Sequence, residues 1–255
     1  TLVADRRAPA ARRRAPGPPR SPVPHPTHVF FDFFGTLVAY APGVRGDDHF
    51  GSHRLLTDAG CALAYEDYLA AWAQTFDEAE RAASASLDEF SMDQACARFL
   101  AAALPGGADW RLLDGFRDIY LEEWSRGVAP IAGVGDMLEE LAARCTLALV
   151  SNTHHAPLVH GLLERLGLAG SFAAVVTSVE HGRRKPCRTI YEHALVLTAG
   201  APGEALFVGD SYGPDYVGPQ AVGMRALLID PQGRAPVPAA DRLASVLEVR
   251  GRVGG

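Results

Sequence analysis

One carboxylate, Asp32, interrupts an apolar segment near the start of the chain. The residues from Val29 to Leu37 read Val-Phe-Phe-Asp-Phe-Phe-Gly-Thr-Leu. The residues before Asp32 are typical of a strand that is buried on both faces of a parallel sheet. A carboxylate at the end of such a strand loses hydration, so it needs a metal ion, backbone donors or a cation beside it to stay charged. Asp32 is therefore the leading candidate for a nucleophile, and a buried Asp that only holds a loop is the alternative.

Polar residues also follow three later apolar segments. Ser151, Thr177 and Asp210 each stand at the end of one such segment. Ligands of open parallel sheets bind beyond the carboxyl ends of the strands, so we expect these side chains and Asp32 to meet in one crevice. Carboxylates suit a magnesium ion, and a phosphoryl group needs hydroxyl and cationic partners. The pattern therefore indicates a site for Mg²⁺ and a phosphoryl group.

Lys185 is the only lysine in the chain. Lys and Arg together number 24, so the other 23 are arginines. A compact ammonium group can enter a crowded site that excludes the broad, planar guanidinium of Arg. We therefore expect Lys185 to have a role that Arg cannot perform, with chance survival of one lysine as the alternative.

The segments that position these residues predict an α/β fold with a doubly wound parallel sheet. Apolar residues recur at helical spacing for about ninety residues after the first strand, and this stretch predicts an all-helical insert with helices at 49–59, 65–83, 87–104 and 109–126. Helices and strands then alternate, as they do when helices cover both faces of a parallel sheet. The helices are expected at 134–144, 157–166, 188–199 and 215–222, and the strands at 146–150, 173–177, 205–208 and 225–229. One more helix is expected at 239–249.

Four parts of the chain follow from this pattern. Residues 1–27, with six Arg and seven Pro, predict a disordered tail. Residues 28–38 and 129–230 form the expected catalytic core, and residues 39–128 form the expected helical domain. Residues 231–255 are expected to be a C-terminal tail.

Composition narrows the partners of the protein. The net charge of −6 argues against binding to nucleic acid, and no apolar run is long enough to span a membrane. The four cysteines are scattered, as is typical of reduced thiols in a cytoplasmic protein. We therefore expect a cytoplasmic protein that acts on a small molecule, and the sequence leaves its oligomeric state open.

Four segments resemble, in the same order, the motifs of the haloacid dehalogenase (HAD) superfamily of hydrolases. The first is Asp-Phe-Phe-Gly-Thr-Leu at 32–37, where the usual form is Asp-x-Asp-Gly-Thr-Leu. The others are Leu-Ala-Leu-Val-Ser-Asn-Thr at 147–153, Arg-Lys-Pro at 184–186 and Phe-Val-Gly-Asp-Ser-Tyr-Gly-Pro-Asp at 207–215. The resemblance covers about residues 27–230 and implies a Rossmann-like core with an α-helical cap inserted after the first motif.

The resemblance also implies roles for these residues. Asp32 would attack the substrate, and water would hydrolyse the aspartyl intermediate that forms. The implied ligands of Mg²⁺ are Asp32, the backbone carbonyl of Phe34 and Asp210, with Asp215 as either a further ligand or a residue that holds the ligands in place. The implied substrate-binding residues are Thr36, Ser151, Asn152 and Lys185. Of these, Ser151 and Lys185 would also offset charge in the transition state, and with Asp32 they form the expected catalytic set.

Phe34 departs from the pattern of the family's phosphatases, which carry a second Asp at this position. That Asp protonates the leaving oxygen, and loss of such an acid typically costs about a hundredfold to ten-thousandfold in rate. Haloacid dehalogenases carry an aromatic Tyr here, since halide leaves without a proton, and this favours carbon–halogen cleavage. The Gly209-Asp210 pair instead matches the magnesium-binding phosphatases. We therefore expect a Mg²⁺-dependent phosphatase acting on a small phosphorylated metabolite, with dehalogenation and a low-activity phospho-ligand-binding module as alternatives.

Overall fold

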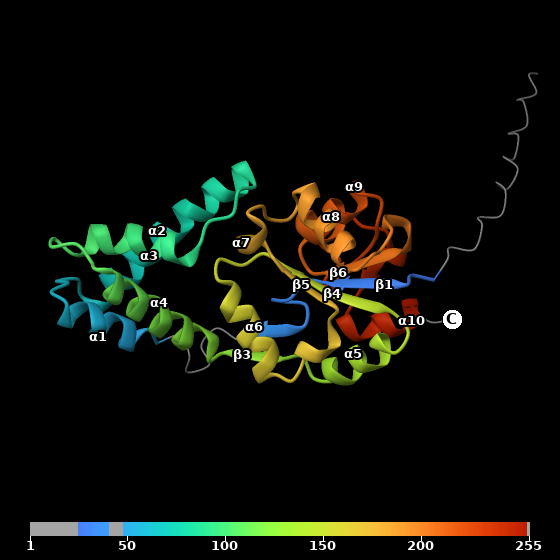
Figure 1. The fold of residues 1–255 in the computed structure, drawn as a ribbon, viewed down its shortest axis with the longest axis horizontal. Helices are drawn as coiled ribbons and strands as arrows, with labels where there is room; N and C mark the ends of the chain where they lie inside the picture. The colour runs from blue at the N-terminus through green and yellow to red at the C-terminus, as the bar shows by residue number, and fades with distance from the viewer. Residues whose placement is uncertain (1–24, 41–47, 254–255) are drawn as a thin grey trace, which may run out of the picture.

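A parallel sheet of six strands forms the centre of the molecule in the computed structural model, which describes residues 25–40 and 48–253 (Figure 1). Most of the expected disordered tail, residues 1–24, lies outside the described residues. In sheet order the strands are β5 (Ala174–Thr177), β4 (Thr146–Ser151), β1 (His28–Phe31), β6 (Ala205–Gly209), β7 (Arg225–Ile229) and β8 (Arg242–Leu243). Strand β1 pairs with both β4 and β6, which places the residue after it between two other strand ends.

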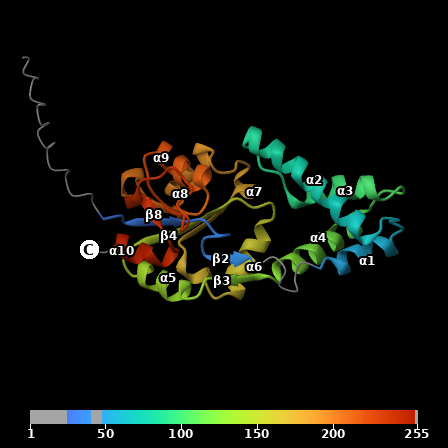
Figure 2. The ribbon, with the colours of Figure 1, turned by 180° about the vertical axis from the view of Figure 1, so that it is seen from behind.

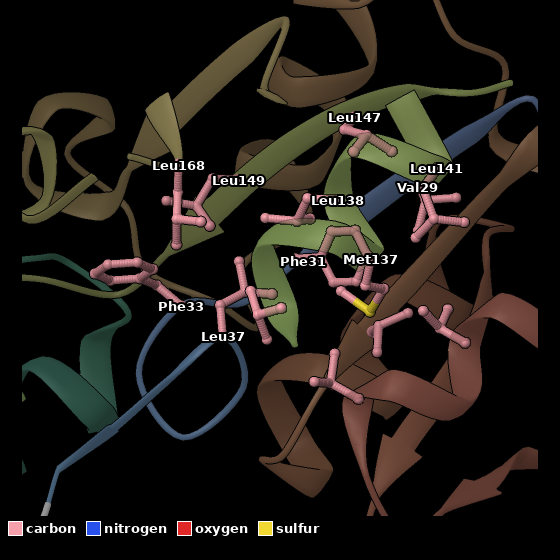
Figure 3. Packing of buried hydrophobic residues seen from close by; sticks show 14 of the residues in the cluster. Val29, Phe31, Phe33, Leu37, Met137, Leu138, Leu141, Leu147, Leu149 and Leu168 are labelled. Carbon is pink, nitrogen blue, oxygen red and sulfur yellow. The ribbon is translucent and has the colours of Figure 1, made fainter. Parts of the chain in front are cut away.

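Helices cover both faces of this sheet (Figures 1 and 2). They are α5 (Val134–Ala142), α6 (Ala156–Arg165), α7 (Ser178–His181), α8 (Arg188–Leu197), α9 (Gly218–Ala221) and α10 (Arg250–Val253). The alternating side chains of β1 explain the two layers, since Val29 and Phe31 belong to one apolar cluster and Phe30 to another. Figure 3 shows Phe31 beside Met137 and Leu138 of α5. The predicted doubly wound α/β fold is confirmed.

In the sequence, four helices are inserted between two short strands that pair with each other. The helices are α1 (Phe50–Asp58), α2 (Tyr65–Ser86), α3 (Met92–Ala103) and α4 (Trp110–Ser125), and the strands are β2 (Val38–Tyr40) and β3 (Val128–Pro130). The helices share an apolar cluster of their own, in which Tyr68, Trp72, Phe99 and Phe116 pack edge to face or stacked. None of the helices in the described ranges is long and apolar enough to cross a membrane.

The expected helix at 87–104 begins later than its apolar spacing indicates. Helix α2 continues to Ser86, and Leu87 then adopts a left-handed conformation with φ of 61° that ends it. Helix α3 starts only at Met92, because Ser91 and Gln94 form a capping box. The five residues from Leu87 to Ser91 are therefore a connection, and this connection contacts the core.

The expected helix at 239–249 is wrong. Single helical turns at Ala239–Asp241 and Val246–Val249 flank strand β8, in which Leu243 pairs with Ile229 of β7. The apolar residues of this segment are buried against the same face of the sheet as α5. Residues 242–253 thus complete the sheet and its core, and the expectation of a tail does not hold for them.

Candidate active site

Asp32 lies directly beyond β1, at the carboxyl edge of the sheet. Its backbone N–H donates to the carbonyl of Val208 at 3.0 Å, which continues the pairing with β6 for one more residue. A tight turn follows, in which the N–H of Gly35 donates to the carbonyl of Val38 at 2.9 Å. Phe33 and Leu37 on either side of this turn are fully buried (Figure 3). The packing of these two side chains therefore fixes the backbone that presents Asp32.

Lys185 joins Asp32 to Asp215. Its Nζ lies 2.7 Å from Oδ1 of Asp32 and 2.7 Å from Oδ1 of Asp215, and its side chain is 2% exposed. Burial alone lowers the pKa of Lys185, but the charges of Asp215 and Asp32 outweigh burial and raise that pKa above its usual value. The ammonium group is therefore charged at neutral pH.

A third carboxylate, that of Asp210, completes a cluster with Asp32 and Asp215. One oxygen from each of the three lies within 4.8 Å of the others. Burial and the charge of Asp32 raise the pKa of Asp215, against the opposing effect of Lys185. Desolvation and the charge of Asp32 likewise raise the pKa of Asp210. The carboxylates thus repel one another, and Lys185 supplies one positive charge to three potential negative charges.

These donors fit a hard divalent cation. Mg²⁺ prefers oxygen ligands and is commonly held by one or two carboxylates. A cation among the three carboxylates would relieve the repulsion that, together with burial, raises the pKa values of Asp210 and Asp215. The side chain of Phe34 turns to a different surface, since its ring packs on Trp124 with ring centroids 5.4 Å apart.

Hydroxyl and amide groups hold the charged residues in place. Buried Thr36 donates its hydroxyl to Oδ2 of Asp32 at 3.1 Å. Ser211, which the sequence interpretation missed, donates its backbone N–H to Oδ2 of Asp215 at 2.9 Å and its hydroxyl to Asp210 at 3.2 Å. The side chain of Asn152 bonds to both the N–H and the carbonyl of Lys185, at 2.8 and 3.0 Å. Asn152 therefore fixes the backbone of Lys185.

The structure brings most of the predicted site residues together. Asp32, Thr36, Lys185 and Asp215 form one hydrogen-bonded group, Asp210 adjoins it, and Asn152 holds its backbone. Ser151 is fully buried at the end of β4, next to β1, and its hydroxyl lies 3.4 Å from the carbonyl of Asn152. Ser151 therefore lies near the group, but the contact of its hydroxyl is with the next residue in the chain.

Glycines at two positions permit the close approach of the carboxylates. A Cβ atom on Gly35 would lie 2.2 Å from Oδ2 of Asp210, and one on Gly209 would lie 2.4 Å from Cγ of Asp215. Gly35 also has φ of +81°, which disfavours any other residue. The turn after Asp32 and the end of the strand before Asp210 can therefore pack this closely only when residues 35 and 209 are glycines.

We expect Gly35→Ala to displace Asp210 and to lower the free energy of unfolding by about 1–3 kcal/mol. Gly107→Ala is the matched control, because Gly107 has φ of +73° and nothing lies within 4 Å of its added Cβ. Both variants incur the cost of a positive φ at alanine, but only Gly35→Ala adds a clash with Asp210. Urea unfolding of both variants therefore separates the two contributions to the loss in unfolding free energy. Equal destabilisation, with equal affinity for Mg²⁺ by calorimetry, would argue against the clash.

A buried polar network that sequence reasoning did not find lies behind Lys185. Glu89, whose side chain is fully buried, accepts hydrogen bonds from Ser178 at 2.6 Å and pairs with His154 at 3.1 Å. Arg184 lies 3.6 Å from the same carboxylate and 2.7 Å from Glu80. His154 also stacks on Phe90, with ring centroids 4.0 Å apart. Glu89 thus ties the connection between α2 and α3 to the segment that carries Lys185.

We expect Glu89→Gln to lower the free energy of unfolding by about 3 kcal/mol at neutral pH, since it removes one partner of buried ion pairs. Burial raises the pKa of Glu89, but hydrogen bonds from His154 and Ser178 and the charges of His154 and Arg184 outweigh burial and lower it below 4.5. The stability from ionised Glu89 is therefore complete above pH 4.5 and is lost as pH falls through the lower, folded pKa.

The difference in unfolding free energy between wild type and Glu89→Gln should accordingly shrink as pH falls below 4.5. Urea unfolding at several pH values measures this difference. Glu80→Gln is the control, because Glu80 is 37% exposed and its pair with Arg184 should contribute less than about 1 kcal/mol. A difference that stays constant with pH would contradict the assignment of this dependence to Glu89.

A pocket of about 440 Å³ opens beside the carboxylate group. Its walls come from α2, α3 and α4 on one side and from Phe34 and the residues after β4 on the other. The walls are largely apolar and include Phe76, Tyr120 and Trp124. The helices between β2 and β3 therefore face the carboxyl edge of the sheet across this pocket.

Comparison with known proteins connects this arrangement to a family. A family model described as haloacid dehalogenase-like hydrolase matches residues 26–223. The human haloacid dehalogenase-like hydrolase domain-containing protein 3 is 36% identical over 129 residues, which cover 50% of this chain and 44% of that protein. The ribulose-1,5-bisphosphate 5-phosphatase of Halopiger xanaduensis is 32% identical over 142 residues, which cover 55% of this chain and 57% of the relative. The chain thus spans about half the length of these two relatives.

A solved structure shares the fold over nearly the whole chain. The 2-haloacid dehalogenase from Pseudomonas syringae pv. Tomato superimposes with a TM-score of 0.66 at 24% sequence identity. The superposition covers 88% of this chain and 96% of that one. At this identity the similarity shows the fold.

Proposed function

Because the chain belongs to the haloacid dehalogenase-like hydrolase family, we propose that it is a Mg²⁺-dependent phosphatase that acts on a small phosphorylated metabolite in the cytoplasm. One observation carries the proposal: Asp32, Asp210 and Asp215 each place a carboxylate oxygen within 4.8 Å of the others, and the buried Lys185 pairs with Asp32 and Asp215. The phosphatase name of the archaeal relative supports the same reaction. The free cysteines of the chain support the location.

Asp32 is the proposed nucleophile. Thr36 and Lys185 each hold one of its carboxylate oxygens, so the group is fixed in position. Attack of one oxygen on phosphorus gives an aspartyl phosphate, which water then hydrolyses. The ammonium of Lys185 and the hydroxyl of Ser151 are the proposed partners of the phosphoryl oxygens, with Thr36 and Asn152 completing the substrate-binding set.

Asp32, Asp210, Asp215 and the carbonyl of Phe34 are the proposed ligands of Mg²⁺. When bound, Mg²⁺ would neutralise charge between the phosphoryl group and the nucleophile. Ser211 keeps Asp215 in place for this role, and Gly35 and Gly209 leave room for Asp210 and Asp215. The four helices at 50–125 are the proposed cap of the catalytic core, within the boundaries 39–128 expected from the sequence, of which residues 41–47 lie outside the described ranges.

Phe34 is the observation that favours a second reaction, carbon–halogen hydrolysis. Its ring borders the pocket at the position where a phosphatase of this family would carry an acid. Halide needs no proton to leave, and the same Asp32 could displace it from carbon. The cluster of three carboxylates favours phosphoryl transfer over this alternative, because a metal-free displacement of halide has no use for Asp210 and Asp215 together.

Release of inorganic phosphate from acetyl phosphate tests the proposal. Acetate leaves without protonation, so Phe34 does not prevent the reaction. We expect hydrolysis with Mg²⁺ that stops after treatment with EDTA and resumes when Mg²⁺ is restored. Release of chloride from 2-chloropropionate, unaffected by EDTA and without phosphate release from acetyl phosphate, would instead establish the second reaction. Binding of Mg²⁺ and phosphate with neither turnover would indicate a binding module.

A further inference from the structure

The pocket beside Asp32 shares two of its walls with the catalytic group. Phe34 follows Asp32 by two residues and borders the pocket. Asn152 borders it too, while its side chain holds the backbone of Lys185 at 2.8 and 3.0 Å. When the phosphoryl group of a substrate lies at Asp32, the rest of the substrate therefore lies in this pocket.

The walls of this pocket suit a flat apolar group. Seven of the lining residues have large apolar or aromatic side chains: Phe34, Phe76, Met92, Tyr120, Leu121, Trp124 and Leu158. The rings of Phe34 and Trp124 meet edge to face with centroids 5.4 Å apart, so each ring can offer its remaining surface to a further ring. A volume of about 440 Å³ accommodates one or two such rings.

The described basic side chains near the pocket are already engaged or uncharged. His154 pairs with Glu89 and stacks on Phe90. Burial and the charge of Arg117 lower the pKa of His155 below its ordinary value of 6.5, so this imidazole is neutral at pH 7. Arg117 in turn is bound by three carboxylates, those of Asp93, Asp114 and Asp118. The described lining thus favours an uncharged leaving group over one that carries a second phosphate.

Phe34 also restricts the chemistry of the leaving group. With a phenyl ring where the family's phosphatases carry an acid, the leaving oxygen departs as an anion. A phenol, with a pKa of about 10 as in Tyr, forms its anion far more readily than an alcohol does. The ring that suits the walls is therefore also the leaving group that suits Phe34.

We propose that the substrates of this site are aryl phosphomonoesters, an inference that rests on the proposed phosphatase function. An oxygen of Asp32 bonds to phosphorus as the bond from phosphorus to the aryl oxygen breaks. The electron pair leaves with the phenolate, which takes a proton from solvent. Water then attacks phosphorus, the bond to Asp32 breaks, and inorganic phosphate and one proton are released. The aromatic ring packs against the surfaces of Phe34 and Trp124 that face the pocket during the first step.

A panel of four phosphates tests this inference on the wild-type protein. Phenyl phosphate has the proposed ring and leaving group, and cyclohexyl phosphate has a ring of similar size on an alcohol. Ribose 5-phosphate is polar, and acetyl phosphate reports on Asp32 and Mg²⁺ without needing the pocket. We expect kcat/KM for phenyl phosphate to exceed the values for cyclohexyl phosphate and ribose 5-phosphate by about a hundredfold or more.

A pair of tryptophan variants on the same helix tests the role of the pocket wall. Trp124→Ala removes a wall, and Trp110→Ala removes a side chain that is 66% exposed at the other end of α4. We expect Trp124→Ala to lower the ratio of kcat/KM for phenyl phosphate to that for acetyl phosphate by about tenfold, mainly through KM. Trp110→Ala should leave this ratio at the wild-type value. Circular dichroism checks that both variants fold, and the wild-type panel stands without them.

The outcomes distinguish failure of the proposed aryl specificity from failure of the proposed phosphatase function. Hydrolysis of acetyl phosphate that needs Mg²⁺ and Asp32, with ribose 5-phosphate turned over as well as phenyl phosphate, would overturn the aryl specificity and keep the phosphatase. Equal turnover of phenyl and cyclohexyl phosphate would overturn the leaving-group argument. Absence of turnover with all four would overturn both proposals.

Discussion

Replacement of Asp32 by asparagine should lower kcat for acetyl phosphate by about ten-thousandfold or more, as loss of a catalytic nucleophile does in other hydrolases. The amide has nearly the shape of the carboxylate but cannot form the aspartyl phosphate. Lys185 keeps its second contact, 2.7 Å from Asp215, so we expect the variant to fold. Phosphate release measured with Mg²⁺ present at several substrate concentrations gives the loss in kcat apart from any change in KM.

Asp58→Asn is a matched control for this experiment. Asp58 is an exposed carboxylate at the end of α1, and its substitution should change kcat by less than about twofold. Asp32→Asn protein that is folded by circular dichroism and retains more than about a hundredth of the wild-type kcat would contradict a nucleophilic role. In that case Asp32 would only position other groups.

Replacement of Lys185 by methionine should reduce both activity and stability. The buried carboxylates of Asp32 and Asp215 lose their shared partner, and removal of one member of a buried ion pair lowers the free energy of unfolding by about 3–5 kcal/mol. Loss of a charged donor to the phosphoryl group should lower kcat by about a hundredfold to a thousandfold. Urea unfolding and phosphate release measure the two effects.

Two further variants show whether Lys185 acts through its position and shape. Lys185→Arg keeps the charge but places a broad planar group where the lysine side chain is 2% exposed, so it should restore little activity. Arg183→Met is the control, because Arg183 is an exposed cation nearby whose pair with Asp88 is screened by solvent. Wild-type activity in Lys185→Arg would contradict the argument from the single lysine.

The sequence predicted the elements of the sheet well, because their pattern reflects burial. Strand β7 covers the predicted residues 225–229, and β4 exceeds its prediction by one residue. The segment at 239–249 was mistaken for a helix because Val246 and Val249 have helical spacing. What determines their conformation is the unpaired edge of β7, which Leu243 joins through pairing with Ile229. No local pattern shows that edge.

Residues of the candidate site that belong to a sequence motif could be predicted. Residues that are brought together only by tertiary contacts could not. Asp32, Lys185 and Asp215 were found from strand ends, composition and motif order, and they lie within hydrogen-bonding distance. Glu89 was not found, because its partners His154 and Arg184 are more than sixty residues away in the chain. The capping-box spacing of Ser91 and Gln94 was the available signal that helix α3 begins after Glu89 and does not include it.

The pairing of β2 with β3 bears on how such a protein can diverge. Val38 faces Pro130 and Tyr40 faces Val128, so the two points where the chain leaves and rejoins the sheet are hydrogen-bonded neighbours. Strands paired in this way lie about 4.8 Å apart, a gap that a short hairpin turn can close. The helices between them can therefore be lengthened, exchanged or lost during evolution without a change in the path of the chain through the sheet. Such an exchange would replace the proposed substrate-binding walls and leave Asp32, Lys185 and Asp215 in place.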